Sequence, residues 1–345
     1  MKKEKSYLDV FVVSSPYQVL SAFEARCHFE SSKNILIVSL PSCSDMVSSK
    51  QICEVVKRTS WDQVYYVYPQ SSNKIFGVIK RWQILLRFLF LRKYKCGMFF
   101  IGDFRVQWKH YMRNMANPIK TILIDDGSAS VNIFNNYLSK NIFYPNKSGV
   151  LKDAIEKILY FPFFLFGCPR DNISLFTSYD VSRDSDVEVI YNDFSNLKSL
   201  FSNSGRKINK EQVWFIGSPY SEKDILSFEY ETEFLERCIN WLKGKGLDVV
   251  YIAHRFDSDR KLDFVSRVCS AEVRRLRLPL EAHVLLEKEV PESIAAIYSS
   301  ALETLPKVAS FSEIYCFKLP CSDSVESISE IYCYYERVGV KVVIV

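Results

Sequence analysis

The sequence predicts an α/β fold of two domains, each built on a parallel sheet that helices cover on both faces. Short runs rich in β-branched and aromatic residues alternate along the chain with segments of helical length, as in βαβ units. The strand-like runs are almost continuously apolar, which is typical of strands buried on both faces. The chain has 345 residues, 48% of them hydrophobic, so it is longer than one typical domain.

The first half of the chain alternates regularly between the two kinds of segment. The predicted strands are Asp9–Val13, Asn34–Val38, Gln63–Val67, Gly97–Ile101 and Thr121–Ile124. Helical patterns lie between them, for example over Gln18–Glu30 and Met46–Arg58. We therefore expect one parallel sheet over this half.

A polar stretch rich in Ser, Asn and Asp, from Ser182 to Lys210, is the predicted domain junction. It divides the chain into Rossmann-like domains of residues 1–195 and 196–345, which we expect to face a cleft. The predicted strands of the second domain are Gln212–Ile216, Asp248–Ala253, Glu281–Leu286, Ala295–Tyr298 and Val308–Ser312, and its predicted helices include Glu231–Lys243 and Ser258–Cys269. Because such sheets bind ligands at the carboxyl ends of their strands, the residues directly after strands are the candidate site residues.

Composition narrows the class of protein. The formal charge of +5 fits an acidic substrate, a membrane surface or simple solubility. Ten cysteines are scattered without a C-x-x-C pair, which predicts that most of them are buried thiols in a reducing cytosol rather than disulfides or zinc ligands. The N-terminus has only a short apolar run, and no window reaches 18 apolar residues. We therefore expect a cytoplasmic protein with no metal site.

Two segments depart from the α/β pattern. Residues Gln63–Gly102 contain no Asp or Glu, and basic residues from Lys74 to Lys95 interleave there with apolar and aromatic ones. The second segment, Ile158–Gly167, is apolar but too short to span a membrane. The basic segment is either a buried helix with a basic outer face or a contact with an anionic membrane surface. Nucleic-acid binding is not expected, because no recognised nucleic-acid module accompanies the charge.

The first candidate site follows the strand that ends at Ile124. Two carboxylates, Asp125 and Asp126, are followed by Gly127 and by Ser128, a candidate helix N-cap. A carboxylate at a strand end can act as a general base, and glycine lets a substrate approach the backbone. Adjacent acids also raise one another's pKa. The alternative is that the two acids only cap the next helix.

The second candidate site follows the strand Asp248–Ala253. His254 can donate to or protonate a phosphate oxygen, and Arg255 adds a fixed positive charge. The chain has four histidines, and the other three fall inside predicted elements, where structural roles are the simpler expectation.

The third candidate site lies nearer the C-terminus. Ser299 and Ser300 begin a predicted helix, whose free N–H groups would bind a phosphate together with the serine hydroxyls, although the pair could also be an ordinary N-cap. Glu281 could accept hydrogen bonds from a ribose diol. Gly217 and Ser218, after the strand Gln212–Ile216, are lesser candidates for donor contact.

Several familiar motifs are missing from the sequence. It has no P-loop, no G-x-G-x-x-G after the first strand, no H-E-x-x-H and no G-x-S-x-G. These absences make kinases, nicotinamide dehydrogenases, zincins and α/β-hydrolases poor candidates. The pair Asp125–Asp126 also lacks the D-x-D spacing by which many nucleotide-sugar transferases hold a metal.

Taken in order, these sites resemble those of bacterial GT-B sialyltransferases. The similarity is to the lipooligosaccharide sialyltransferases of glycosyltransferase family 52 and to bacterial polysialyltransferases. That group has an acid-acid-glycine motif, a His-Pro motif and a later serine pair, which match Asp125–Gly127, His254–Arg255 and Ser299–Ser300. Glu281 lies where the related enzymes place a ribose-binding glutamate, and Phe11–Gln18 also resembles their first strand and turn. Arg255 replaces the family's proline, so the turn after the strand can differ.

The resemblance implies a metal-independent, inverting transfer of sialic acid from CMP-sialic acid to a terminal galactoside. The first domain would bind the acceptor and the second the CMP donor. Asp126, or alternatively Asp125, would take the acceptor's proton, and His254, Arg255, Ser299 and Ser300 would meet the charge of the leaving phosphate.

Other readings remain open at this stage. The donor could be another CMP-nonulosonic acid, of the legionaminic or pseudaminic type, or a UDP or GDP sugar. The chain could also be an inactive glycan- or nucleotide-binding module, or a membrane adaptor. The expected acceptors are lipid-linked surface glycans such as O-antigen, capsule or lipooligosaccharide, reached from the inner face of the cytoplasmic membrane.

Overall fold

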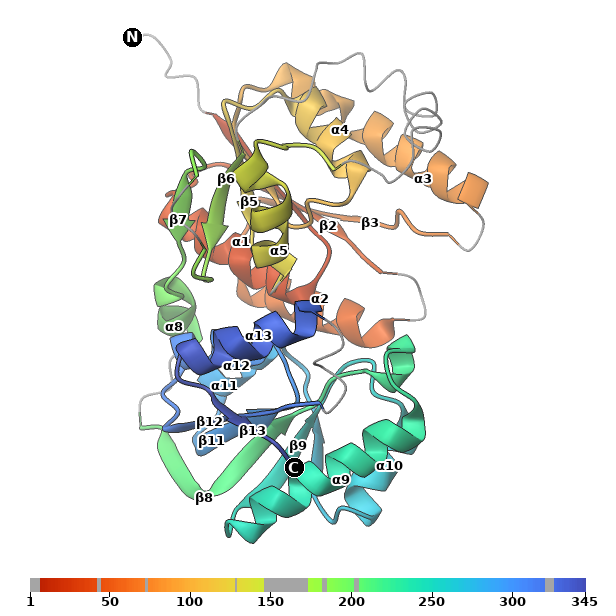
Figure 1. Ribbon diagram of the computed structural model, residues 1–345. Helices are drawn as coiled ribbons and strands as arrows, with labels where there is room; N and C mark the ends of the chain where they lie inside the picture. The colour runs from red at the N-terminus through yellow and green to blue at the C-terminus, as the bar shows by residue number, and fades with distance from the viewer. Residues whose placement is uncertain are drawn as a thin grey trace. The chain divides into compact units, whose positions relative to one another are not determined.

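The computed structural model describes residues 7–41, 45–71, 74–127, 129–145, 173–181, 185–201, 205–319 and 326–345. The chain forms two compact units, Met1–Leu197 and Lys198–Val345 (Figure 1). The division lies inside the polar stretch Ser182–Lys210 and two residues after the 195/196 boundary expected from sequence. Ser128 and the apolar run Ile158–Gly167 lie outside the described residues.

Unit 1 contains a sheet of seven described strands in the order β3-β2-β1-β4-β5-β6-β7, and all of its strand pairs are parallel. The strands are β1 (Leu8–Val13), β2 (Asn34–Ser39), β3 (Gln63–Val67), β4 (Cys96–Ile101), β5 (Lys120–Ile124), β6 (Ile173–Thr177) and β7 (Val189–Tyr191). The helices are α1 (Pro16–His28), α2 (Met46–Arg58), α3 (Lys74–Arg87), α4 (Gln107–Ala116) and α5 (Ala129–Asn136), with 3-10 turns η1 (Phe88–Lys93) and η2 (Leu138–Lys140). Helix α8 (Ser195–Phe201) crosses the division between the units.

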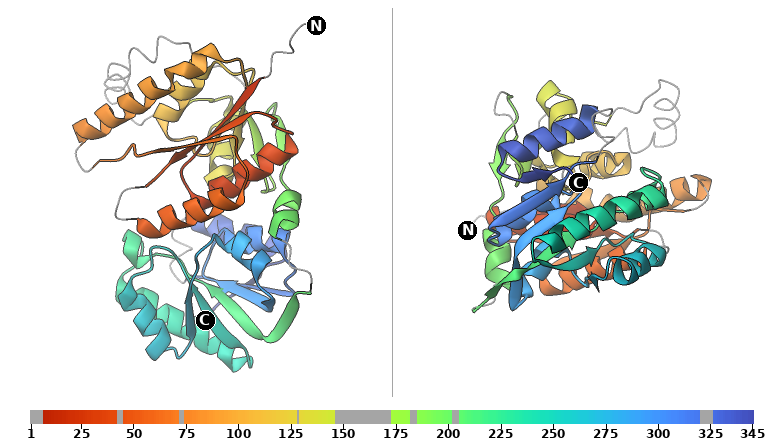
Figure 2. Two further views of the ribbon diagram at one scale, coloured as in Figure 1. Left: turned by 180° about the vertical axis from the view of Figure 1, so that it is seen from behind. Right: turned by 60° about the horizontal axis from the view of Figure 1, so that its bottom comes forward.

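Helices cover both faces of the unit 1 sheet. Figures 1 and 2 show α1 and α2 on one face and α3 and α4 on the other. This layering follows from right-handed crossovers, because the chain moves outward from β1 to β3 and then returns to β4 on the other side. The strands β1 and β2 are buried at every position, as their continuous apolar runs predict.

Unit 2 repeats this architecture with six described strands in the order β10-β9-β8-β11-β12-β13, again with parallel pairs only. The strands are β8 (Lys207–Ile216), β9 (Asp248–Ala253), β10 (Glu272–Arg275), β11 (Glu289–Ala296), β12 (Glu313–Phe317) and β13 (Lys341–Val343). The helices are α9 (Phe228–Gly244), α10 (Asp259–Arg267), α11 (Leu280–Leu286), α12 (Ala301–Val308) and α13 (Glu326–Arg337), with the turn η3 (Ser221–Lys223). Each unit has its own hydrophobic core, and Cys238, Cys269 and Cys316 lie buried in unit 2.

Four predicted strands of unit 2 are wrong or displaced. The strand predicted at Gln212–Ile216 ends as expected but begins at Lys207. Residues Glu281–Leu286, predicted as a strand, belong to helix α11. The strand predicted at Ala295–Tyr298 begins six residues earlier and ends at Ala296. The strand predicted at Val308–Ser312 begins only at Glu313, because helix α12 continues through Val308. Short apolar runs fit both periodicities, so pattern alone could not separate helix from strand at these places.

The order of strands reverses direction at one place in each sheet, between β1 and β4 in unit 1 and between β8 and β11 in unit 2. Open α/β sheets bind ligands beside such switch points, at the carboxyl ends of the strands. Unit 1 presents Ser14 and Gly102 there, and unit 2 presents Gly217 and Ile297.

Candidate active site

Asp125 is completely buried at the end of β5. Its carboxylate accepts hydrogen bonds from the Thr177 hydroxyl at 2.6 Å and from the Ser178 amide at 2.7 Å. Burial raises the pKa of Asp125, although these hydrogen bonds oppose the rise. Thus Asp125 ties the end of β5 to the end of β6, and its carboxylate does not face solvent.

Asp126 is the carboxylate that solvent reaches, with 18% of its side chain exposed. Its Oδ1 accepts a hydrogen bond from Gln18 Nε2 at 2.6 Å, and its Oδ2 lies 3.6 Å from the Arg105 guanidinium. Burial and the negative charge of Asp103 raise the pKa of Asp126 to about 6, against the opposing effects of Gln18, Lys109 and Arg105. A carboxylate with this pKa is ionised at neutral pH and is still basic enough to accept a proton. The sequence predicted a raised pKa from the adjacent Asp125, whereas the structure assigns the rise to burial and Asp103.

Gly127, directly after Asp126, has φ of +67°, a left-handed conformation that glycine adopts without strain. Together with the hydrogen bond from the Asp126 amide to Ser130 Oγ, at 2.9 Å, this turn leads the chain from β5 into helix α5. Gly127 therefore shapes the turn that carries Asp126.

Four residues around Asp126 were missed by sequence reasoning, namely Gln18, Asp103, Arg105 and Lys109. Asp103 follows β4 and could have been found by the same strand-end criterion that selected Asp126. Gln18 and Lys109 lie within helices α1 and α4, where a polar residue usually faces solvent. Both are buried instead, and no pattern in the sequence shows this.

His254 follows β9 in unit 2 and is held by its own loop. Its ring Nδ1 accepts a hydrogen bond from the Phe256 amide at 3.2 Å, and its backbone amide donates to Asp257 Oδ2 at 2.8 Å. Because a backbone N–H can only donate, the neutral ring carries its proton on Nε2. Burial and the charges of Arg255 and Lys223 lower the pKa of His254 to about 3. Of the two roles predicted for His254, the structure favours hydrogen-bond donation over proton transfer.

The loop that carries His254 is anchored by Lys261, which is completely buried. Its ammonium group contacts the carboxylates of Asp257 at 2.7 Å, Glu222 at 2.8 Å and Glu231 at 2.8 Å, and it donates to the Ser218 carbonyl at 3.0 Å. Burial lowers the pKa of Lys261, but the three carboxylates raise it above the usual value. The cluster ties helix α10, turn η3, helix α9 and the His254 loop to one another.

Gly217 and Ser218 directly follow β8, as predicted, but Gly217 has a packing role. A Cβ added at Gly217 would lie 2.6 Å from Asp257 Oδ2 and 2.6 Å from the Tyr251 hydroxyl. The Ser218 hydroxyl lies 3.5 Å from the Tyr298 carbonyl, which also accepts a hydrogen bond from the Tyr220 hydroxyl at 2.9 Å. These contacts join the ends of β8 and β11.

Ser299 and Ser300 precede helix α12, three and four residues after β11 ends. The Ser299 hydroxyl accepts the Ala301 amide at 3.3 Å, and the Leu302 and Glu303 amides donate to the carbonyls of Ser299 and Ser300. The predicted anion site at free helix amides is therefore smaller than expected, because these amides already have local acceptors. The Ser300 hydroxyl makes no capping hydrogen bond.

Glu281 and Arg255 complete the predicted set. Glu281, on helix α11, is only 8% exposed and accepts a hydrogen bond from the Thr304 hydroxyl at 2.7 Å, and burial raises its pKa. Arg255 places its guanidinium 5.0 Å from the centre of the Phe256 ring. Both residues lie within unit 2, as do His254, Gly217, Ser218, Ser299 and Ser300, whereas Asp125, Asp126 and Gly127 lie in unit 1.

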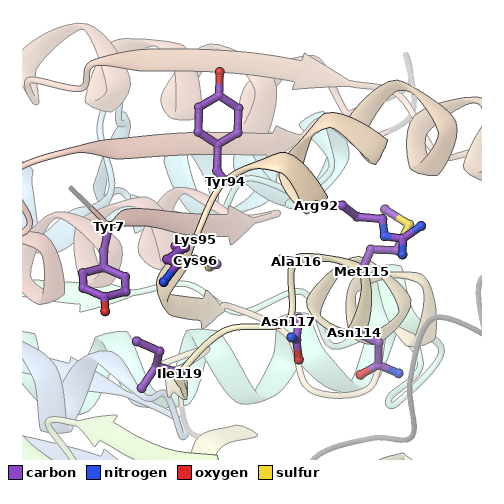
Figure 3. Close-up of a pocket in the computed structure, with 10 residues that line it drawn as sticks. All are labelled: Tyr7, Arg92, Tyr94, Lys95, Cys96, Asn114, Met115, Ala116, Asn117 and Ile119. Carbon is purple, nitrogen blue, oxygen red and sulfur yellow. The ribbon is translucent and has the colours of Figure 1, made fainter. Parts of the chain in front are cut away.

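A cavity of about 500 Å³ lies at the amino ends of strands β1 and β4 in unit 1, at the opposite end of the strands from Asp126. Figure 3 shows its lining residues, which include the basic side chains of Arg92 and Lys95 and the aromatic rings of Tyr7 and Tyr94. This cavity is separate from the Asp126 site, which lies at the carboxyl ends of the strands. Among the described residues, no group of three or more His, Cys, Asp or Glu side chains is arranged to hold a metal ion.

Two Rossmann-like units with polar sites at their strand ends give the chain a GT-B fold. The fold is similar to a UDP-N-acetylglucosamine 2-epimerase, with 10% identity and a TM-score of 0.51, over 97% of this chain and 88% of that one. It is also similar to an α/β-galactoside α-2,3-sialyltransferase from Photobacterium phosphoreum, with 11% identity and a TM-score of 0.50, over 98% of this chain and 99% of that one. At these identities the similarity shows the fold alone.

The sequence itself identifies the family. Residues 9–318 match the family model of alpha-2,8-polysialyltransferase, and the chain belongs to that family. The protein is therefore a sialyltransferase, and the resemblance drawn from its motifs is confirmed. A search of curated proteins finds no match.

Proposed function

We propose that this protein transfers sialic acid from CMP-sialic acid to a glycan hydroxyl in one inverting displacement. The acceptor oxygen attacks the anomeric carbon of the donor, the bond from that carbon to the CMP phosphate breaks, and Asp126 takes the acceptor's proton. The observation that carries the proposal is the Asp126 carboxylate, which is partly exposed at a strand end and has a pKa of about 6. Asp125 is fully buried and bonded to Thr177 and Ser178, so it positions strands instead.

Unit 2 would meet the charge that develops on the CMP phosphate. His254 supplies a neutral Nε2–H donor in a fixed orientation, and Ser300 has a hydroxyl without a capping bond. Arg255 and the Ser299 hydroxyl are further contacts, and Glu281 would face the ribose. Preorganised donors of this kind stabilise developing negative charge, and we expect transfer to proceed without an added metal ion.

The family description bears on the acceptor. The resemblance to bacterial sialyltransferases implied a terminal galactoside, whereas the description of the matching family names an alpha-2,8-polysialyltransferase, whose acceptor we take to end in sialic acid. We therefore propose two acceptor classes, galactoside-terminated and sialic acid-terminated surface glycans, of which the family match favours the second. The natural acceptor would be an O-antigen, capsule or lipooligosaccharide glycan.

CMP release tests this proposal directly. Purified protein would be assayed with CMP-sialic acid and with CMP-linked legionaminic and pseudaminic acids, in EDTA, with each acceptor class and without acceptor. We expect acceptor-dependent release from CMP-sialic acid, which Asp126→Asn lowers by about 10²- to 10⁴-fold. Asp9→Asn is the matched control, because Asp9 is a buried aspartate of the same sheet that lies at the amino end of β1, away from the Asp126 site. Release from another CMP-nonulosonic acid alone would change the donor, and full activity of Asp126→Asn would overturn the assignment of the base.

We also propose that helix α3 attaches the protein to the inner face of the cytoplasmic membrane. None of the described helices is long and apolar enough to cross a bilayer. Helix α3 exposes 70% of Ile75, 59% of Phe76 and 45% of Ile79. Lys80 and Arg87 are exposed on the same helix. An exposed apolar face with basic neighbours is the composition of an interfacial helix.

Co-sedimentation with vesicles tests this attachment. We expect the protein to sediment with vesicles containing an anionic phospholipid and to remain in solution with purely zwitterionic ones. Charge reversal at Lys80, Arg81 and Arg87 should reduce sedimentation, while charge reversal at Lys207 and Lys210, exposed at the start of β8, should have no effect. Equal sedimentation of both variants would remove the membrane proposal.

A further inference from the structure

Gln18 joins the predicted base to the turn after β1. It is 2% exposed, and both ends of its amide are engaged. Its Oε1 accepts the Ser14 amide at 2.7 Å, and its Nε2 donates to Asp126 Oδ1 at 2.6 Å. The Asp126 site is therefore connected through one side chain to the switch point between β1 and β4.

The orientation of this amide is fixed by chemistry. A backbone N–H can only donate, so the Gln18 oxygen faces Ser14 and its NH₂ group faces Asp126. A donor at that place stabilises the ionised form of the carboxylate. With Oδ1 engaged by Gln18, Oδ2 is the oxygen left to take a proton.

Packing holds Gln18 in this position. The Ser15 hydroxyl caps helix α1 by accepting the Gln18 amide at 3.2 Å, and Pro16 begins the helix. Gly102, at the end of β4, leaves room for the side chain, since an added Cβ would meet Gln18 Oε1 and lie 2.8 Å from its Cδ. Lys109 of helix α4 donates to the Ser14 hydroxyl at 2.6 Å and so anchors the turn that binds Gln18.

We propose that Gln18 is a positioning residue that fixes Oδ1 of Asp126 and leaves Oδ2 to accept the proton of the acceptor sugar. The inference rests on the role of Asp126 proposed above. Three other charged groups face Asp126, namely Asp103 and Arg105 after β4 and Lys109 on α4. All three remain in place when Gln18 is changed, so a change in the pH dependence reports the amide itself.

The test is the pH profile of kcat/KM for three variants. In the wild type we expect activity to rise with pH through about 6, as Asp126 ionises. Gln18→Leu removes the donor and should move this rise to higher pH by about 0.5 to 1. Gln18→Glu places a second carboxyl against Asp126 and should move it further. Gly102→Ala displaces the Gln18 side chain and should act in the same direction as Gln18→Leu.

Gln107→Leu is the matched control. Gln107 is a buried glutamine at the start of helix α4, and the side chains that contact the Asp126 carboxylate in the described residues are Gln18 and Arg105. A folded Gln18→Leu variant with an unchanged profile would overturn the inference and leave Gln18 a structural residue. If Asp126→Asn keeps its activity and its profile, then the proposed role of Asp126 as the base has failed instead. The two failures are therefore distinguishable.

Discussion

Lys109 of unit 1 and Lys261 of unit 2 are both completely buried, yet their charges are balanced in different ways. Lys261 contacts three carboxylates within 2.8 Å, which raise its pKa. Lys109 donates to the Ser14 hydroxyl, and among the described residues no carboxylate lies within ion-pair distance of it. Burial accordingly lowers the pKa of Lys109, although Asp103 and Asp126 oppose this from a distance.

The difference matches the tasks proposed for the two units. In unit 2 the charge of Lys261 is paired with carboxylates of the same unit. The loop that presents His254 is therefore held by charges within the protein itself. In unit 1 the buried cation acts through space on Asp126, which titrates near pH 6. Asp126, the proposed base, thus belongs to unit 1, in which the buried Lys109 has no close carboxylate among the described residues.

Replacing Lys261 should have the largest effect. Lys261→Met leaves three carboxylates without their cation, and breaking a buried ion pair in this way costs about 3–5 kcal/mol. We expect a lower unfolding temperature and faster hydrogen exchange in peptides that cover residues 254–262. Wild-type exchange in those peptides would show that the cluster does not hold the loop.

Replacing His254 should affect catalysis without changing its pH dependence. His254→Ala removes one preorganised donor and should lower kcat/KM by about 10²- to 10³-fold. His254→Gln restores an N–H donor near the position of Nε2 and should recover part of the loss. The pKa of His254 is about 3, so both variants should keep the activity rise near pH 6. A displaced rise would mean that His254, not Asp126, controls the pH dependence.

The smallest effect is expected for Lys109→Met. Loss of this cation disfavours the Asp126 anion, so the pKa of Asp126 rises and the activity rise moves to higher pH by about 0.5 to 1. Within the described part of the chain Lys109 has no ion pair to break, so the free energy of unfolding should change by about 1 kcal/mol or less. A loss of stability as large as that of Lys261→Met would contradict the comparison.

The fold of unit 1 was more predictable from sequence than that of unit 2. Strands β1 to β5 lie within one residue of their predicted bounds, and all of them except the edge strand β3 are mostly buried. The run at Ile173–Thr177 was missed, and so was the charged edge strand β10. Helix α11 was predicted as a strand, since seven residues with mixed apolar spacing fit either period.

Some residues of the candidate site were also predicted from sequence and others were not. Asp126 and His254 were predicted because each directly follows an apolar strand. Their supporting residues Gln18 and Lys261 were not, because both lie in helices whose sequences give no sign that these polar side chains are buried. Burial of a polar helical residue depends on what packs against it, and only the fold supplies that information.

Gly217 carries a warning for mutational mapping of this protein. An alanine scan of unit 2 would score position 217 as a donor contact if activity fell. The structure gives another cause, because the new methyl group would collide with Tyr251 and Asp257, which hold the His254 loop. Such a loss would measure distortion of the loop, and binding of a CMP analogue to each variant would have to be measured before any contact were assigned.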